Sequence, residues 1–221
     1  MLQHVISQDL GEIWNVLSRQ EKRVLASSFQ IHQYKKNQMI YAEGDEPEHL
    51  WCLLKGKVKK YKHGICDRMQ ILRLHRPVQF FGYRAYFARE AYVSSAAAIE
   101  KSVIGAVPLK VVERLIRSNM DVAMFFIHEL SRNLGGSDTK IVNLTQKHIR
   151  GRLAEALLLL AENYGLEDDS ATLKIYMSRE DLAALSNMTT SNAIRTLSNF
   201  VNEKLIVVDG RRIQILIESQ Q

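Results

Sequence analysis

The residues best suited to recognition chemistry gather in one nearly uncharged segment, NMTTSNAIRTLSNF, at residues 187–200. Its polar side chains are short hydrogen-bonding groups with a single Arg. We expect one helix face to carry Thr190, Ser191, Asn192, Arg195 and Asn199. Such side chains can approach base edges and phosphates without the repulsion that Asp or Glu would bring, and Arg can bind guanine through two hydrogen bonds. The missing acidic residues therefore predict a surface that reads nucleic acid.

A tight pair of helices is predicted to present that face. Ser178 is a good N-cap with Asp181 in the capping-box position, and Asn187 suits the left-handed conformation that reverses the chain. Thr189 then caps the second helix. The apolar positions of this helix are Ala193, Ile194, Leu197, Phe200 and Val201. The pattern predicts a helix-turn-helix whose second helix reads DNA. The alternative is a helical hairpin packed on another element, with Thr and Ser as neutral surface residues.

A hairpin follows the second helix. In LIVVDGRRIQI, Asp209-Gly210 lies between alternating apolar residues and predicts a two-residue turn. Arg211 and Arg212 are then expected at its tip, where they can reach backbone phosphates. The whole string therefore predicts a winged helix-turn-helix.

The net charge of the chain is not evidence for DNA binding. The 221-residue chain has a formal net charge of +6 at pH 7. Residues 1–138 contain 20 Lys and Arg against 14 Asp and Glu, whereas residues 139–221 contain ten of each. Much of the excess lies in KGKVKKYKH, a run more typical of a solvated strand and turn than of a phosphate track. Its lysines are Lys55, Lys57, Lys59, Lys60 and Lys62.

Cysteine content and hydropathy predict a cytoplasmic protein with no membrane partner. Cys52 and Cys66 are the two cysteines and form no CxxC pattern, which fits a reducing compartment. The longest apolar run, ALLLLA at residues 156–161, is far too short to span a membrane. The first residues lack a basic region followed by a long apolar run.

The remaining chain divides into two zones of different periodicity. After a helix expected near residues 9–29, residues 38–107 contain many short extended runs bounded by turn residues, which predict a compact barrel or roll. From about residue 149 the pattern predicts helix, strand, helix, helix and hairpin. The predicted strand is ATLKIYM, with Leu173, Ile175 and Met177 on one side.

Between these zones the apolar period is about 3.5 residues. The repeating positions are Ile127, Leu130, Leu134, Ser137, Ile141 and Leu144. Such a seam favours one long helix that pairs with a second copy in a coiled coil. The alternative is an amphipathic helix packed on the roll. Gly135 and Gly136 each cost roughly 1 kcal/mol relative to Ala within a helix, so we expect a close approach to the backbone, a bend or fraying there.

Together these motifs resemble the Crp/Fnr family of bacterial transcription regulators over nearly the whole chain. IYAEGDEPEHLWCLLKGKVKKY is similar to the family's first roll strands, VQFFG to the entry of its ligand cassette, and MSREDLAALSNMTTSNAIRTLSNF to its DNA-binding signature. The resemblance implies an α+β fold. An N-terminal double-stranded β-helix, jelly-roll-like, would form the effector domain at residues 1–118. A long dimerisation helix and hinge (119–147) and a C-terminal winged helix-turn-helix domain (148–221) would follow.

The resemblance also implies partners and DNA contacts. Its base and phosphate readers fall on Arg179, Thr189, Thr190, Ser191 and Arg195, and the polar face and hairpin add Asn192, Asn199, Arg211 and Arg212. Thr190-Ser191 stands where members similar to the catabolite activator carry Arg-Glu, so the operator sequence does not transfer. The expected partners are a near-palindromic operator in double-stranded DNA, a second copy of the chain, and RNA polymerase.

An effector pocket in the roll is implied as well. Its residues would be Gly82, Tyr83, Arg84, Ala85, Tyr86, Arg89, Val93, Ser94, Ser95 and Ser137. In cyclic-AMP-binding members a Glu follows the cassette Gly and an Arg pairs with the cyclic phosphate, whereas here these positions hold Tyr83 and Val93. A phosphate buried against Val93 would lack a paired cation, so the sequence argues against cyclic AMP. Arg84 and Arg89 either substitute with a different reach or lie on the surface.

The types and numbers of residues also bear on ligands other than cyclic AMP. A different small molecule with an aromatic part near Tyr83 or Tyr86, or an empty constitutive pocket, fits the residues better than cyclic AMP. Two cysteines are too few for an iron–sulfur cluster, isolated His residues argue against haem, and no spacing predicts a metal site.

The leading hypothesis is therefore a homodimeric, sequence-specific transcription regulator gated by an unidentified small effector at the roll. A constitutive DNA-binding dimer with a non-sensing roll is the alternative. An enzyme is not expected, because the sequence has no nucleophile–base pair, phosphate-cradling Gly-rich loop or HExxH motif. The residues leave open the effector, the operator and whether transcription is activated or repressed.

Overall fold

The protein is described by a computed structural model that covers residues 11–216. Residues 9–10 of the first expected helix and residues 217–221 of the expected C-terminal domain lie outside the described residues. The chain forms two compact units. The first contains residues up to 63 and residues 72–137, and the second contains residues 64–71 and those from 138 onwards.

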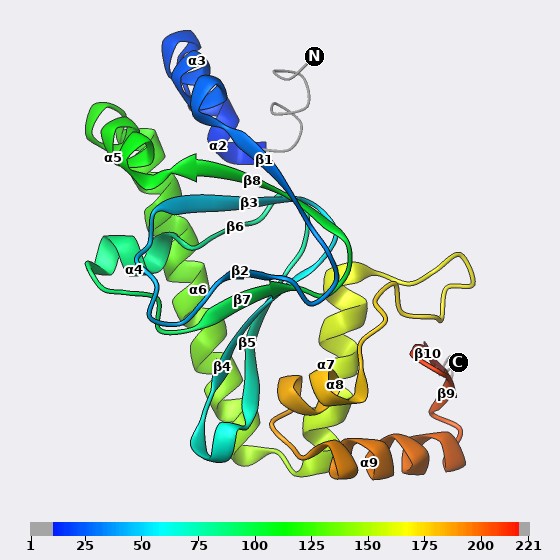
Figure 1. Ribbon diagram of the computed structural model, residues 1–221. Coiled ribbons are helices and arrows are strands. Elements are labelled where there is room, and N and C mark those ends of the chain that lie inside the picture. The colour runs from blue at the N-terminus through cyan, green and yellow to red at the C-terminus, as the bar shows by residue number, and fades with distance from the viewer. Residues whose placement is uncertain (1–10, 217–221) are drawn as a thin grey trace. The chain divides into compact units, whose positions relative to one another are not determined.

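The first unit contains a roll of two four-stranded sheets (Figure 1). One sheet has the order β1-β8-β3-β6 and the other β2-β7-β4-β5. Their strands are β1 (Gln30–Tyr34), β2 (Met39–Tyr41), β3 (His49–Lys55), β4 (Val58–His63), β5 (Met69–His75), β6 (Phe80–Phe81), β7 (Ser95–Ala98) and β8 (Ser102–Pro108). Of β5, residues 72–75 belong to the first unit and residues 69–71 to the second. Tyr41, Leu53, Val58, Ala96 and Ile104 share one buried cluster. Because these residues come from both sheets, the sheets pack face to face around a common core.

Helices cover the outer face of the first sheet. They are α2 (Gly11–Asn15), α3 (Arg19–Ser28), α5 (Leu109–Ser118) and the start of α6 (Met120–Gln146), while α4 (Tyr83–Ala88) follows β6. The single helix predicted near residues 9–29 is wrong in its continuity. Ser18 breaks it, because its hydroxyl accepts a hydrogen bond from Glu21 N at 3.3 Å while its own N–H donates to Glu21 Oε2 at 2.8 Å. This capping box starts a new helix at Arg19.

The long helix α6 is unbroken over 27 residues, which corresponds to about 40 Å. Asn119 separates it from α5, because the Asn119 side-chain oxygen accepts a hydrogen bond from Asp121 N at 3.0 Å. Gly135 and Gly136 lie inside the helix, and a Cβ atom added to either would meet nothing within 4 Å. The helix does not fray at these glycines, and the side of each that a Cβ would occupy is open.

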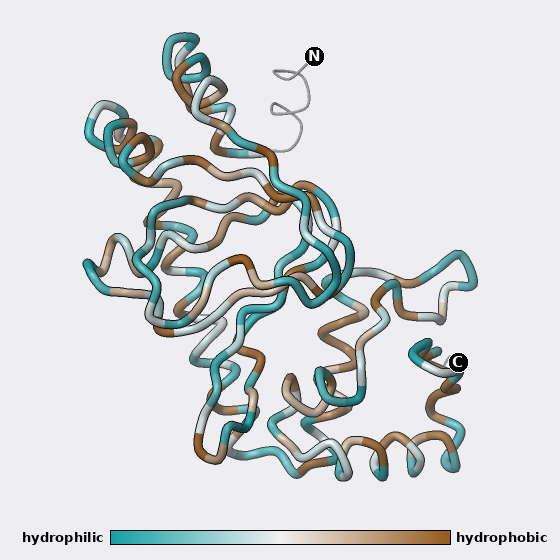
Figure 2. Tube along the Cα trace, viewed as in Figure 1, coloured by the Kyte–Doolittle hydropathy of each residue, from teal (hydrophilic) through white to brown (hydrophobic). Residues whose placement is uncertain are grey.

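The second unit packs three helices and a hairpin. They are α7 (Ile149–Tyr164), α8 (Arg179–Leu185), α9 (Thr190–Asn202), β9 (Ile206–Asp209) and β10 (Arg212–Ile215). Figure 2 shows apolar and polar residues alternating along α9, as expected for a helix with one buried side. The strand predicted at residues 171–177 is wrong. Only isolated bridges join Leu173 to Leu166 and Thr172 to Gln214. Leu173, Ile175 and Met177 are nevertheless buried.

Candidate functional site: a DNA-reading helix and a cavity in the roll

The turn before α9 is fixed by local hydrogen bonds. Asn187 has a φ of 51° and reverses the chain, and Met188 is buried beneath the turn. Thr189 Oγ1 accepts a hydrogen bond from Asn192 N at 3.2 Å and so caps α9. At the start of α8, Ser178 Oγ accepts a hydrogen bond from Asp181 N at 3.0 Å, which confirms Ser178 as the N-cap.

The face of α9 expected to read DNA is open. Ser191, Arg195 and Asn199 are exposed, and Thr190 and Asn192 are partly exposed. Arg195 Nη2 donates to the Asn192 side-chain oxygen at 2.9 Å, which orients the guanidinium along the helix.

The buried stripe of α9 differs in part from the prediction. It consists of Ala193, Thr196, Leu197 and Phe200, at spacings of three and four residues. Ile194 and Val201 were assigned to this stripe by periodicity, but their exposed fractions are 48% and 39%. Both lie one position past a buried residue, at the edge of the stripe, where the other helices do not cover them. The outer surface of α9 is therefore more apolar than the sequence indicates.

The hairpin turn lies one residue later than predicted. Asp209 pairs with Arg212, so Gly210 and Arg211 form the turn. Gly210 has a φ of 55° at the first central position, which the right-handed twist of a hairpin favours and which Gly adopts readily. Arg211 is at the tip, whereas Arg212 is on the strand with its guanidinium carbon 5.9 Å from the ring centre of Tyr176.

Arg179 contacts the same turn. Its Nη2 donates to Gly210 O at 2.6 Å. The residue expected to contact DNA at the start of α8 thus also holds the hairpin of β9 and β10, which is the wing of the winged helix-turn-helix.

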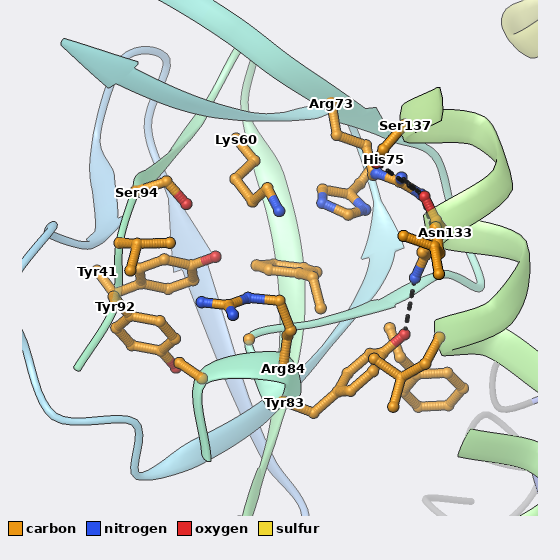
Figure 3. A pocket seen from close by; sticks show the side chains of 17 residues that line it. Tyr41, Lys60, Arg73, His75, Tyr83, Arg84, Tyr92, Ser94, Asn133 and Ser137 are labelled. Atoms are coloured by element: carbon orange, nitrogen blue, oxygen red, sulfur yellow. Dashed lines mark hydrogen bonds between the residues drawn. The ribbon is translucent and has the colours of Figure 1, made fainter. Parts of the chain in front are cut away.

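A cavity of about 390 Å³ opens in the first unit between the second sheet, α4 and the part of α6 before residue 138 (Figure 3). It is lined by Tyr41, Lys60, Arg73, His75, Phe80, Phe81, Gly82, Tyr83, Arg84, Ala85, Tyr92, Val93, Ser94, Leu130, Asn133, Leu134 and Ser137. Seven of these belong to the effector pocket expected from the sequence: Gly82, Tyr83, Arg84, Ala85, Val93, Ser94 and Ser137.

Three residues expected in this pocket lie elsewhere. Tyr86 and Arg89 line a separate surface groove beside α5, where Tyr86 Oη donates to Glu113 Oε2 at 2.6 Å. Arg89 therefore does not replace the missing phosphate-binding Arg. Ser95 is buried and its hydroxyl accepts a hydrogen bond from Glu43 N at 2.9 Å, which ties β7 to the loop after β2.

Several lining residues were not predicted. Lys60 belongs to the lysine run interpreted as a solvated face, yet its side chain lines the cavity. Arg73 and His75 come from β5, Tyr41 from β2, and Asn133 from α6.

The electrostatics of the cavity are dominated by cations. Burial, with the positive charges of Arg73 and Arg84, lowers the pKa of Lys60 to about 8. Burial also lowers the pKa of His75 to about 3, helped by the charges of Lys60 and Arg73, so the imidazole is neutral at pH 7. Burial raises the pKa of Tyr83 to about 12, and this phenol is therefore also neutral.

The lining does not fit a cyclic nucleotide held as the resemblance implies. Val93 offers no cation at the position of the phosphate-binding Arg. Tyr83 replaces the ribose-binding Glu, and its hydroxyl accepts a hydrogen bond from Asn133 Nδ2 at 3.0 Å. The glycine of the cassette is present here as Gly82, and the structure requires it. Its φ is +88°, and a Cβ there would lie 2.5 Å from Trp51 Cδ1.

The outer side of α6 carries exposed apolar residues every seven positions. The exposed fractions of Met120, Ile127, Leu134 and Ile141 are 73%, 51%, 65% and 59%. Of the other seam residues, Leu130 packs partly against the core of the first unit, Leu144 is partly buried, and Ser137 is exposed. Ser137 Oγ donates back to Asn133 O at 2.8 Å.

Residues 11–216 contain neither a cluster of metal-binding side chains nor a helix that could span a membrane. Within residues 11–216, no three or more His, Cys, Asp or Glu side chains gather closely enough to hold a metal ion. Over the same range, none of the helices combines the length and the apolar character that crossing a bilayer requires.

Comparison with known proteins agrees with this architecture. The sequence profile of the cyclic nucleotide-binding domain matches residues 31–119, and that of the Crp-like helix-turn-helix domain matches residues 151–219. A CRP-like cAMP-activated global transcriptional regulator of Mycobacterium tuberculosis is 22% identical over 192 residues, 86% of each chain. FixK2 of Bradyrhizobium japonicum has a similar solved structure, with a TM-score of 0.77 and 23% identity over 86% of this chain and 93% of its own.

A further structural neighbour is CLP, a c-di-GMP-responsive global regulator of Xanthomonas campestris. It has a TM-score of 0.75 and 16% identity over 91% of this chain and all of its own. A cyclic-nucleotide-binding-like roll, a long helix and a winged helix-turn-helix define a DNA-binding transcription regulator, and the relatives are regulators and not enzymes. The chain belongs to the Crp/Fnr family.

Proposed function

We propose that this regulator works as a homodimer that reads a near-palindromic operator and is gated by a small effector in the roll. The observation that carries the DNA-reading role is the exposed polar face of α9. No acidic residue occurs between Asp181 and Glu203, so nothing on this helix repels phosphate. The orienting bond from Arg195 to Asn192 supports Arg195 as the base-reading residue.

The exposed seam of α6 supports the homodimer. Four large apolar side chains at a seven-residue spacing form a stripe that a second α6 can cover in a coiled coil. The open backbone at Gly135 and Gly136 lets a partner helix come close. Two DNA-binding domains related by a two-fold axis would read half-sites about 34 Å apart, which is one turn of DNA.

Hydrogen bonds between the cavity and α6 support the gating. Asn133 donates to Tyr83 Oη, while Arg73 Nη2 donates to Asn133 O at 3.1 Å and its Nη1 to the Asn133 side-chain oxygen. Asn133 directly precedes the seam residue Leu134. A ligand that moves Tyr83 or Arg73 therefore acts on the helix that holds the dimer, and it shifts the equilibrium by its difference in affinity for the two arrangements.

The cellular location and the protein partner of this regulator follow from its DNA target. A bacterial regulator that binds an operator acts in the cytoplasm, and RNA polymerase is the proposed partner there. Similar proteins are described as responding to cAMP and to c-di-GMP, so membership of this fold group does not by itself fix the effector.

A selection from randomised duplex DNA tests the DNA-reading role. We expect a symmetric motif with half-sites about 10 base pairs apart, and a dimer in sedimentation velocity. Ser191→Glu should abolish selection, because it places a negative charge on the reading face. Asn202→Glu, at the far end of the same helix, is the control and should still select the motif. A strictly monomeric protein, or a selection without symmetry, would contradict the proposal.

Gating is tested separately by adding metabolites to the protein and measuring its operator affinity. A ligand that changes the affinity supports gating. Binding of the operator that no ligand in a broad panel changes would favour a constitutive dimer.

A further inference from the structure

The residues that line the cavity in the roll carry positive charge and include no acid. Among its seventeen lining residues, Lys60, Arg73 and Arg84 are cationic at neutral pH and none is Asp or Glu. Lys60 and Arg84 reach into the same space from opposite walls in Figure 3. Lys60 forms no ion pair with any residue in the described part of the chain. Like charges brought together in a partly buried space favour the entry of an anion.

The two Arg residues keep their charge available to a ligand. Arg84 pairs with Glu90, but about 46% of the Arg84 side chain and 43% of the Glu90 side chain are exposed, and exposed ion pairs contribute little. Arg73 is bonded to the neutral Asn133, which orients its guanidinium. Glu129, outside the lining, acts on Arg73 by charge alone, and burial outweighs it, so the pKa of Arg73 is lowered. An incoming carboxylate or phosphate can therefore compete for both groups.

Aromatic rings form the other walls. Tyr41 and Tyr92 stack with ring centres 3.8 Å apart, and His75 stacks on Phe81 at 4.8 Å. Because His75 is neutral, this wall is a flat and largely apolar surface. A volume of about 390 Å³ is at the small end of the range for ligand pockets. The walls favour a compact ligand with a flat part.

We propose that this cavity binds a small organic anion other than a cyclic nucleotide, with its carboxylate or phosphate between Lys60 and Arg84 and its flat part against the aromatic walls. The inference rests on the proposed function, because this anion would be the effector. The positive charge comes from β4, β5 and α4, and not from the position of Val93. The site therefore suits an anionic group placed differently from the cyclic phosphate of the family.

Calorimetry and thermal unfolding of the full chain with matched probes test the proposal. The probes are benzoate with its neutral counterpart benzamide, phenyl phosphate with phenol, and cyclic AMP, all at constant ionic strength. We expect benzoate or phenyl phosphate to bind at least tenfold more tightly than its neutral counterpart and than cyclic AMP. The preferred member of the pair distinguishes a carboxylate from a phosphate ligand.

Variants assign the binding to the cavity. Lys60→Met and Arg84→Gln should each weaken anion binding by tenfold or more. Lys59→Met, on the neighbouring position of β4 and outside the cavity, should leave it unchanged. The proposal is overturned if the anions bind no better than the neutral probes, if cyclic AMP binds most tightly, or if all three variants behave alike.

Operator binding by the ligand-free protein is measured in parallel. A protein that binds DNA but no anion refutes this inference alone. A protein that binds the anion but no DNA refutes the proposed function and leaves the site standing.

Discussion

Arg179 at the start of α8 donates a hydrogen bond to Gly210 O at the tip of the wing, at 2.6 Å. The first helix of the helix-turn-helix is thereby tied to the hairpin that follows the second. The residue that the sequence assigns to DNA contact therefore also holds the hairpin in place.

The first prediction concerns this contact. Arg179→Ala should raise amide hydrogen exchange across residues 206–215 and weaken binding to all DNA sequences by about fivefold to tenfold, because one charged hydrogen bond is lost. Arg211→Ala removes only a proposed phosphate contact and should leave exchange in the wing unchanged. Equal exchange in the two variants would show that Arg179 does not hold the wing.

The second prediction separates reading from anchoring. Arg195→Ala should cost roughly 1–3 kcal/mol of operator binding and relax the preference at one base pair of each half-site. Arg211→Ala should weaken all sequences alike and reduce the slope of affinity against salt by about one. Fluorescence anisotropy on single-base operator variants at several salt concentrations measures both effects. If both variants lose affinity with unchanged preference, the division between reading and anchoring is wrong.

The third prediction concerns the seam of α6. Leu134→Glu should convert the protein to a monomer in sedimentation velocity, because it places a charge in the middle of the apolar stripe. Operator affinity should then fall by about a hundredfold or more, since only one half-site is held at a time. Leu158→Glu on α7 is a matched control, because Leu158 is also exposed, at 58%. A Leu134→Glu protein that stays dimeric would place the interface elsewhere.

The fourth prediction follows from the pKa of Lys60. This pKa is about 8 in the folded protein against 10.5 for an ordinary Lys, so the unfolded chain binds the proton more tightly. The folded state bears the full cost of the charge below pH 8, and that cost disappears as the pH rises towards 10.5. Lys60→Met should therefore raise the Tm at pH 7 by several degrees.

Differential scanning calorimetry across pH measures this effect. The gain in Tm from Lys60→Met should shrink between pH 8 and pH 10.5. Lys55→Met, at an exposed position at the end of β3, should change the Tm by no more than about 1 °C, as for most surface substitutions. A gain that stays constant across this range would show that packing, and not charge, is its cause.

The DNA-reading helix was predictable because its signals are local. Capping by Ser178 and Thr189, the turn at Asn187 and the lack of acids all lie within 25 residues, and each acts through the nearest turn of chain. The hairpin turn was misplaced by one residue, because Asp-Gly and Gly-Arg both offer a Gly at a central position. Only the strand register, with Asp209 opposite Arg212, decides between them.

The cavity was only half predictable because the roll assembles it from distant segments. Alternation along β4 places Lys60 on the same side as the buried Val58. Tyr61, on the opposite side, is buried too, so the alternation does not identify which side of the strand faces the interior. Asn133 meets Tyr83 across 50 residues and Arg73 across 60. No periodicity within one segment carries such information.

Because α6 is unbroken, it would act as a rigid rod in the proposed gating. A rod about 40 Å long that tilts by about 5° displaces its far end by about 3.5 Å, close to the 3.4 Å step between stacked bases. In the proposed gating, a shift of about 1.7 Å at Asn133, near the middle of the rod, would thus be doubled at its far end to about one step of the double helix.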